Sequence, residues 1–395
     1  MSYQYIGQSQ VRSDGIEKVT GRASYVYNME VPNMVHARVV RSLVPHARVK
    51  SIDVSKATKL PGVLLVFTRD DIDAGIYPFF GPVVHDQAVV AIDKVRYVGD
   101  IVAAVVAEDP EIAEEAVDLV EVEYEELPAV FDAEEAIKPS APLVHEKLNL
   151  PPWGFSDVRA TLHPVEGTNI VNHFRVRRGN VEQGFAEADY VFEDTYRLPA
   201  VQHCPLEPHA TIARYEADGS LTVWSNTQTP FIVQAQVAQT LGIPQNRVRI
   251  IVPFLGGGFG AKTYPKLEPL VAVLALKTGR PVKLTLTREE EFITITRHAA
   301  TVSIKTGVKK DGTITARQTK ILWNTGAYAD IGPRLSKNAG YASVGPYRIP
   351  NVWVDSYCVY TNMPPAGALR GYGIPQVSLA YETQMDKIAR ELGYD

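Results

Sequence analysis

The chain has 395 residues, of which 45% are hydrophobic and 22% charged, a composition typical of a globular protein with roughly two or three domains. Its formal net charge of -5, with acidic and basic residues interspersed, argues against a nucleic-acid partner, which requires a basic surface. No stretch reaches the ~18 apolar residues that span a bilayer, and the polar start lacks signal-peptide features, so we expect a cytoplasmic location.

The first part of the chain, residues 35 to 126, alternates short β-rich runs with one clear helix. Strands are predicted at 35–42, 63–67 and 101–107. A helix should begin at Pro110, because Asp109 can cap it and proline fits the first helical position. Four prolines then fall between 138 and 152, where regular structure is disfavoured. We therefore predict two domains, 1–137 and 161–395, joined by a linker at 138–160.

The second part shows longer alternation of strands and helices, and the chain as a whole is predicted to be α+β. Strands are expected at 221–226, 247–254, 282–286, 301–308 and 313–323, with a hairpin turn at Asp311-Gly312 between the last two. Helices are expected from Pro230 to a stop at Gly242, and from about Pro265 to Gly279.

Only two cysteines, Cys204 and Cys358, are present. They are too few for a disulfide framework or for an iron–sulfur cluster. Any such cluster must therefore belong to another chain. His203, Cys204, Glu207 and His209 lie close together in the sequence, but their spacing matches no recognised metal site, so we expect no protein-ligated metal.

The segment Leu255-Gly-Gly-Gly-Phe-Gly-Ala-Lys-Thr263 lies between a predicted strand and a predicted helix. Its glycines allow the backbone to approach a ligand and to point N–H groups at an oxygen or a phosphate. A tight structural turn is one alternative. A Walker A loop is another, since Gly256, Lys262 and Thr263 fit its spacing, but Ala261 stands where that motif needs glycine.

A second segment, Ala368-Leu-Arg-Gly-Tyr-Gly-Ile-Pro-Gln376, combines a cation, two glycines and an aromatic ring. The guanidinium could bind an anionic group, and a flat substrate could stack on the ring. Taken alone, this segment is better explained as a proline-flanked loop.

In order and spacing, the two segments, with Arg297-His298 between them, resemble the first molybdopterin-binding domain of the xanthine dehydrogenase and aldehyde oxidase family. Earlier residues resemble the α/β-hammerhead domain that opens the large subunits of this family. They include Asp14-Gly15, Lys18 to Gly21, Pro45-His46-Ala47 and Val98-Gly99-Asp100. The resemblance covers nearly the whole chain. It implies the front half of a large subunit, similar to divided subunits such as that of nicotinate dehydrogenase.

The resemblance also implies roles for single residues around a molybdenum–molybdopterin cofactor, present alone or as its cytosine dinucleotide. Gln228 would donate a hydrogen bond to an oxygen ligand of the molybdenum, and Arg370 would orient the cofactor. The backbone amides of Phe259 and Gly260 would approach the oxo group of the cofactor, and Gly258 and Gly371 would also belong to the cofactor-binding site. Phe259, Thr263, Asn338 and Tyr372 would line the substrate site.

The implied reaction is hydroxylation with water as the oxygen source. In the family the general base is a Glu of a later glycine-rich segment, which residues 1–395 do not contain in recognisable form. The resemblance therefore implies partner chains: a second molybdopterin-binding chain that carries this Glu, an iron–sulfur subunit and a FAD subunit. We expect the chain to be catalytically incomplete by itself, either as a divided subunit or as a truncation.

Departures from the family bear on the substrate. Purine-oxidising relatives place a Glu after the lysine of the glycine segment and an Arg nine residues before the Tyr-x-Ile-Pro-Asn stretch. Here those positions are Thr263 and Asn338, so purine recognition should be weak. Ala366 to Ala368 also lack the cysteine of the family's carbon monoxide dehydrogenases. The expected substrate is a small aromatic N-heterocycle such as a pyridine carboxylate, with an aldehyde next. The rival functions are a P-loop-like nucleotide-binding protein and a non-catalytic scaffold.

Overall fold

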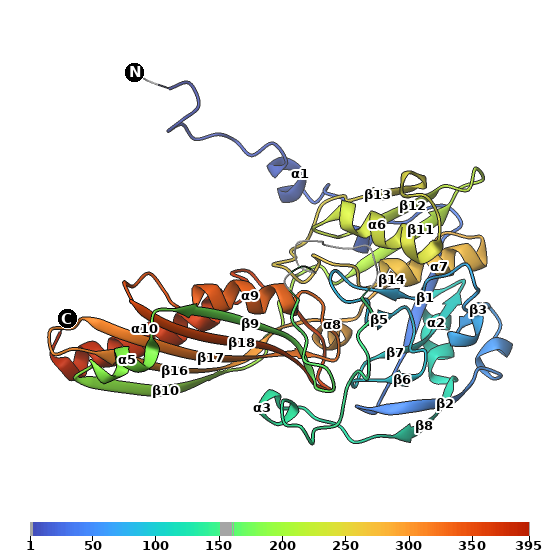
Figure 1. Ribbon diagram of the computed structural model, residues 1–395. Helices are drawn as coiled ribbons and strands as arrows, with labels where there is room; N and C mark the ends of the chain where they lie inside the picture. Colours follow the sequence, from blue (N-terminus) through green and yellow to red (C-terminus); the bar gives the residue numbers. More distant parts are fainter. Residues whose placement is uncertain (1–2, 151–159, 161, 395) are drawn as a thin grey trace.

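The computed structural model describes residues 3–150, 160 and 162–394, which form two lobes side by side (Figure 1). One lobe is built on a seven-stranded sheet and the other on an elongated five-stranded sheet. Strands and helices are mixed in both lobes, and this confirms the predicted α+β class. No helix among the described residues is long and apolar enough to cross a membrane.

The seven-stranded sheet joins segments from both ends of the chain. Its order is β13 (Val248–Ile251), β12 (Leu221–Ser225), β11 (Ala210–Tyr215), β14 (Val282–Thr285), β1 (Val35–Arg41), β7 (Ile101–Ala107) and β3 (Val63–Phe67). Strand β1 pairs in parallel with β14, with Val35 opposite Val282. The two segments that the predicted linker separates therefore share one sheet.

Three helices accompany this sheet: α2 (Pro110–Asp118), α6 (Pro230–Leu241) and α7 (Glu268–Thr278). Helix α7 is buried from Glu268 to Ala275, because it packs against β11, β12 and β14 on one side and against α6 on another. A helix that is apolar on all sides is expected at the centre of a core. This core holds the strand ends that lead into the glycine segment.

The five-stranded sheet forms the second lobe. Its order is β10 (Tyr190–Leu198), β16 (Ala299–Val308), β17 (Ile314–Gly326), β18 (Asn351–Tyr360) and β9 (Ile170–Arg178). Helix α9 (Gly332–Ala342) packs on β9 and β18, and α10 (Ile374–Leu392) packs on β10 and β16 (Figure 1). These two helices contact one another, so they cover the sheet together.

The remaining elements are short. The helices are α1 (Gly15–Val19), α3 (Ala133–Ala136), α5 (Val181–Ala186) and α8 (Arg288–Thr294). The strands are β6 (Lys94–Val95), β2 (Ala47–Asp53) and β8 (Glu121–Glu126) in one small sheet, β4 (Phe79–Phe80) with β5 (Gln87–Ala88), and β15 (Thr296–Arg297) with β19 (Ala366–Gly367).

Several predicted boundaries are confirmed. Asp109 caps α2 by accepting a hydrogen bond from the N–H of Glu111, and Gly242 ends α6 in the left-handed conformation. The helix expected from about Pro265 begins instead at Glu268. Its carboxylate accepts hydrogen bonds from the N–H groups of Lys266 and Leu267, so these two residues precede the helix as part of its cap.

The predicted linker lies partly outside the described residues, at 151–159 and 161. Its described part, 138–150, contains no helix or strand, as its prolines suggest. It is nonetheless packed on the protein: the N–H of His85 donates to the carbonyl of Asn149, and Leu148 and Leu150 contact a hydrophobic cluster that includes Tyr360. The domain boundaries themselves remain predictions.

Candidate cofactor-binding site

Two loops meet where the lobes join. We call residues 255–263 the glycine loop and residues 366–373 the arginine loop. The N–H of Arg370 donates to the carbonyl of Phe259 at 2.8 Å. Gly260 lies so close to the second loop that a Cβ there would be 2.2 Å from the carbonyl oxygen of Ala368. The predicted cofactor residues of the two segments are therefore brought together.

Both loops hold a non-glycine residue in the left-handed backbone region. Phe259 has φ 52° and Tyr372 has φ 53°. Aromatic residues seldom adopt this conformation, and such strain gathers at ligand sites, where surrounding contacts fix it. The neighbouring glycines Gly257, Gly260 and Gly371 also have positive φ. Phe259 is 49% exposed, so its ring is available to line a site.

Gln228 precedes α6 and lies against the glycine loop. Its Oε1 accepts a hydrogen bond from the N–H of Gly260 at 2.9 Å, and its own N–H donates to the carbonyl of Lys262 at 2.8 Å. A Cβ on Gly258 would be 2.5 Å from this Oε1, so only glycine admits the arrangement. The side chain is exposed, and its Nε2 has no acceptor within the described part of the chain. Gln228 thus presents a fixed, available donor.

Two backbone N–H groups of the glycine loop differ in whether they already donate a hydrogen bond within the protein. The N–H of Gly260 is taken by Gln228, so it acts through that side chain instead of meeting a ligand directly. The N–H of Phe259 has no acceptor among the described residues. Of the two amides predicted to approach the cofactor, only that of Phe259 is open in this geometry.

Arg370 and Gly371 are both exposed in the arginine loop. The backbone of Arg370 is tied to Phe259, but its guanidinium forms no hydrogen bond or ion pair with any described residue. A cation that the fold positions and leaves without an anion is suited to an anionic ligand.

The residues predicted to line the substrate site do not all lie at the two loops. Thr263 is partly exposed at the end of the glycine loop, where its carbonyl accepts a hydrogen bond from the hydroxyl of Thr229. Asn338 is exposed on α9, and no described contact joins it to either loop. Tyr372 looked exposed from the sequence, but its ring is partly buried between two hydrophobic clusters and its hydroxyl is fully buried.

On its other side, the glycine loop is braced by residues 202–209. Glu207 accepts a hydrogen bond from the N–H of Gly256 through Oε2 at 2.7 Å. The Nζ of Lys262, which is 2% exposed, donates to the carbonyl of Glu207 at 2.6 Å and lies 3.6 Å from Oε2. Burial lowers the pKa of Lys262, while the charges of Glu207 and Glu291 oppose this effect.

The burial of Lys262 also decides against the Walker A alternative. In a P-loop the lysine must reach the phosphates of a nucleotide. Here its amine is buried and held by Glu207, and α7 begins only at Glu268, well after the loop ends at Thr263.

Two histidines of residues 202–209 also contact the two loops. His209 binds Glu291 through Nδ1 at 2.8 Å and faces the carbonyl of Ala261 through Nε2 at 3.3 Å. His203 lies 2.7 Å from the carbonyl oxygen of Ala368 through Nε2, so the segment holds both loops. Burial by itself would raise the pKa of Glu291, but the charge and hydrogen bonds of His209 bring it below its ordinary value. The clustering of these histidines in the sequence was the available signal, and no protein-ligated metal was expected there.

The site offers hydrogen-bond donors: the side-chain amide of Gln228, the N–H of Phe259 and the guanidinium of Arg370. Among the described residues no group of three or more His, Cys, Asp or Glu is placed to hold a metal ion. The nearest described cavity, about 470 Å³, borders Gly256 and is lined on its other sides by Tyr25, Tyr27 and Arg288. Gln228 and Arg370 do not line this cavity.

Comparison with known proteins agrees with this geometry. Residues 20–128 match the family described as aldehyde oxidase and xanthine dehydrogenase, a/b hammerhead domain, and residues 162–395 match the molybdopterin cofactor-binding domain. The chain belongs to the xanthine dehydrogenase and aldehyde oxidase family.

Relatives in this family differ in length. The chain is 38% identical over 394 residues to the nicotinate dehydrogenase large molybdopterin subunit of Eubacterium barkeri, covering 100% of this chain and 88% of that protein. It is 40% identical over 388 residues to a probable xanthine dehydrogenase subunit of Bacillus subtilis, covering 98% of this chain but 49% of that protein. The chain thus spans about half the length of one relative and most of the other.

Solved structures of the family have the same fold. Quinoline 2-oxidoreductase from Pseudomonas putida 86 superposes with a TM-score of 0.88 at 32% identity, covering 100% of this chain and 49% of that one. Aldehyde oxidoreductase from Desulfovibrio gigas gives 0.87 at 29% identity, covering 97% and 42%. These relatives are oxidoreductases, and the chain corresponds to part of such a protein.

Proposed function

We propose that the chain binds a molybdenum–molybdopterin cofactor at the junction of the two loops and supports hydroxylation of a small aromatic N-heterocycle. The observation that carries this proposal is the fixed Gln228 amide, whose Oε1 is held by Gly260 while Nε2 stays available. The N–H of Phe259 and the guanidinium of Arg370 add two further donors without acceptors in the described residues.

This donor set fits the cofactor. The pterin carries the dithiolene sulfurs that hold the metal, so the protein needs no ligand cluster of its own, and its phosphate and oxygen atoms need hydrogen-bond donors. When bound, the cofactor supplies the two-electron oxidation chemistry that side chains cannot provide. The close approach of Gly258 and Gly260 to their neighbours leaves the loop rigid, which favours preorganised binding.

The residues of this chain then have separate tasks. Gln228 donates to an oxygen of the cofactor, and this contact strengthens if negative charge develops there during the reaction. Arg370 neutralises anionic charge of the cofactor, and the ring of Phe259 excludes water from the reacting side. Thr263 and Asn338 leave the substrate site without the two charged purine contacts that the purine-oxidising relatives have.

Further groups must come from outside residues 1–395. We expect a second molybdopterin-binding polypeptide to provide the general-base Glu, and an iron–sulfur subunit and a FAD subunit to carry electrons away. The substrate is a pyridine carboxylate or a related heterocycle, with an aldehyde as the second candidate.

The test is a complex of this chain, co-expressed with its companion polypeptides and assayed with an artificial electron acceptor. Molybdenum and pterin content is measured first, and turnover of nicotinate, xanthine and benzaldehyde is then compared. We expect a cofactor-loaded complex that prefers nicotinate. A complex without molybdenum would favour the scaffold alternative, and a preference for xanthine would contradict the substrate assignment.

A further inference from the structure

A buried hydroxyl lies beside the arginine loop without a hydrogen-bond partner. The Oη of Tyr372 is shielded from solvent, and no described residue accepts from it or donates to it. Burial raises the pKa of this hydroxyl far above its ordinary value, with smaller contributions from Tyr264 and, in the opposite direction, from Arg334. Buried polar groups are nearly always satisfied, and an unpaired one costs about 1–3 kcal/mol. An acceptor supplied by a ligand would remove this cost.

Arg334 is the nearby cation. It is partly exposed on the first turn of α9, and its guanidinium makes no hydrogen bond or ion pair within the described part of the chain. By contrast, two other arginines of this lobe are engaged: Arg177 binds Asp355 at 2.7 Å, and Arg317 donates to the carbonyl of Val344. Arg334 therefore offers a complete set of donors beside the site.

The fold brings α9 and the arginine loop into contact. A Cβ on Gly373 would lie 2.7 Å from the Cβ of Ala339 and 3.2 Å from Leu335. Tyr372 packs against the cluster that contains these two α9 residues. Arg334 directly precedes Leu335 on α9, and its charge acts on the Tyr372 hydroxyl.

The local charge also favours an anion. Asp330 lies close by, but its carboxylate is paired with the buried amine of Lys266 at 2.6 Å and accepts the N–H of Ile331. The pair leaves Arg334 as an uncompensated positive charge. Asn338, one turn later, is neutral, so Arg334 stands about one helical turn from the position that purine-oxidising relatives use, and Lys337 is a second cation of α9.

We propose that Arg334 and the hydroxyl of Tyr372 together bind the carboxylate of an aromatic heterocyclic substrate and make these two residues specificity-determining. The inference rests on the proposed function and names the substrate feature that the site selects. The carboxylate forms a charge-assisted hydrogen bond with Arg334 and gives the Tyr372 hydroxyl the acceptor that it lacks. A neutral amide of the same shape keeps a carbonyl acceptor for the Tyr372 hydroxyl but loses the charge-assisted pairing with Arg334.

The experiment uses the cofactor-loaded complex with nicotinate and with nicotinamide, its neutral counterpart. Kinetic constants are measured for both, and equilibrium dialysis of labelled nicotinate gives a readout that needs no turnover. In Arg334→Gln we expect the Kd and KM for nicotinate to rise about 10- to 100-fold while those for nicotinamide change less than about 3-fold. In Tyr372→Phe we expect a rise of about 3- to 10-fold for nicotinate and a smaller rise for nicotinamide, whose neutral carbonyl is the weaker acceptor.

Arg348→Gln is the matched control, because Arg348 is an exposed arginine of the same lobe with no described partner. It should leave both ligands unaffected. Equal losses for nicotinate and nicotinamide in Arg334→Gln, or no loss for either, would overturn the carboxylate assignment. Failure of the wild-type complex to oxidise any heterocycle or aldehyde would instead contradict the proposed function, and dialysis would still decide whether Arg334 selects the carboxylate.

Discussion

The two sides of the glycine loop differ in how their polar groups are satisfied. On the side of residues 202–209, Glu207 binds the N–H of Gly256 and the amine of Lys262, and His209 binds Glu291. The Nδ1 of His203 is a buried atom of this side that lacks a partner among the described residues. On the side of Gln228 and Arg370, donors are positioned but have no acceptors among the described residues. We infer from this difference that the first side holds the glycine loop in place and that the open side binds a ligand. Substitutions on the side of residues 202–209 should therefore lower the free energy of unfolding. Substitutions on the side of Gln228 and Arg370 should instead lower cofactor binding and leave the stability nearly unchanged.

The largest effect on stability is expected for Lys262→Met. Removing the amine leaves the carboxylate of Glu207 buried without its cation, and breaking a buried pair in this way costs about 3–5 kcal/mol. The free energy of unfolding, measured by denaturant titration, should fall by this amount, and the cofactor content should fall with it. Lys320→Met, at an exposed lysine of β17, should change stability by less than about 0.5 kcal/mol. Equal stability of the two variants would show that the brace is not required.

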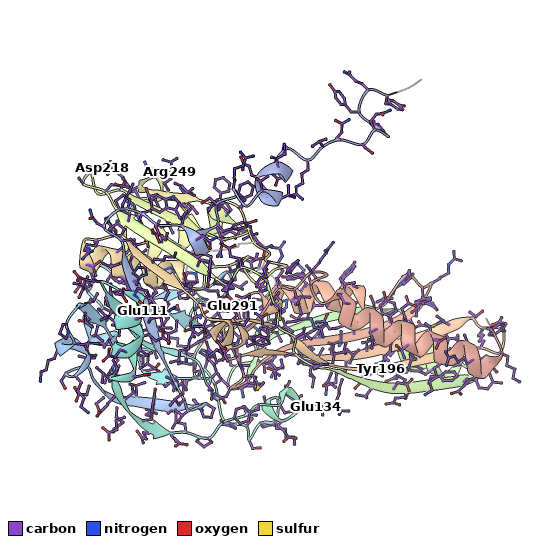
Figure 2. All side chains as sticks on the ribbon, turned by 180° about the vertical axis from the view of Figure 1, so that it is seen from behind. Glu111, Glu134, Tyr196, Asp218, Arg249 and Glu291 are labelled. Atoms are coloured by element: carbon purple, nitrogen blue, oxygen red, sulfur yellow. The ribbon has the colours of Figure 1, made fainter. Side chains whose placement is uncertain are left out.

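Glu291→Gln should have a smaller, pH-dependent effect. Figure 2 shows Glu291 in the interior where the lobes meet. Its folded pKa lies below the ordinary 4.5, so ionised Glu291 stabilises the fold above that pH and the contribution is lost as the pH falls. At pH 7 the variant should be less stable by about 1.5–3 kcal/mol, and the difference should shrink below pH 4.5.

The control for this pH profile is Glu289→Gln, an exposed carboxylate on the same helix α8. Denaturant titrations from pH 3 to pH 8 should give it the wild-type profile. A constant difference between Glu291→Gln and the wild type across that range would mean that ionisation of Glu291 does not stabilise the brace.

The smallest stability change is expected for Arg370→Gln on the open side, within about 0.5 kcal/mol, because its guanidinium contacts no described residue. Molybdenum and pterin content of the complex should nevertheless drop. Arg249→Gln serves as the comparison, since Arg249 lies at the outer edge of the first lobe, away from Glu291 (Figure 2). Full cofactor content in Arg370→Gln would remove Arg370 from the site.

Local signals in the sequence predicted much of the fold. The cap at Asp109, the left-handed end of α6 at Gly242 and the strand of 63–67 depend on neighbouring residues, and each is found where expected. The two loops were recognised because each is a compact motif. The family resemblance implied that both loops lie at the cofactor, but the direct contact between Phe259 and Arg370 was not predicted, since nothing local joins residues so far apart.

What the sequence did not predict depends on distant contacts. The pairing of β1 with β14 and the strands β9, β10 and β18 were not predicted. Helix α9 was missed because Gly332, Pro333 and Gly340 are poor helix formers. Gly340 is needed there for close packing, since a Cβ would lie 2.8 Å from Phe174. With α9 unrecognised, Arg334 could not be placed beside Tyr372.

We propose above all that the Nε2 of Gln228 donates a hydrogen bond to a ligand while its Oε1 accepts one from the N–H of Gly260. Gln228→Glu keeps an acceptor for the N–H of Gly260 but removes the donor, whereas Gln228→Ala removes both. The measurement is turnover of nicotinate per molybdenum in the wild type and both variants. The account predicts a loss of roughly 10²-fold or more in both variants at full metal loading, because each lacks the donor. Wild-type turnover in Gln228→Glu would contradict it, since the hydrogen bond to Gly260 alone would then suffice.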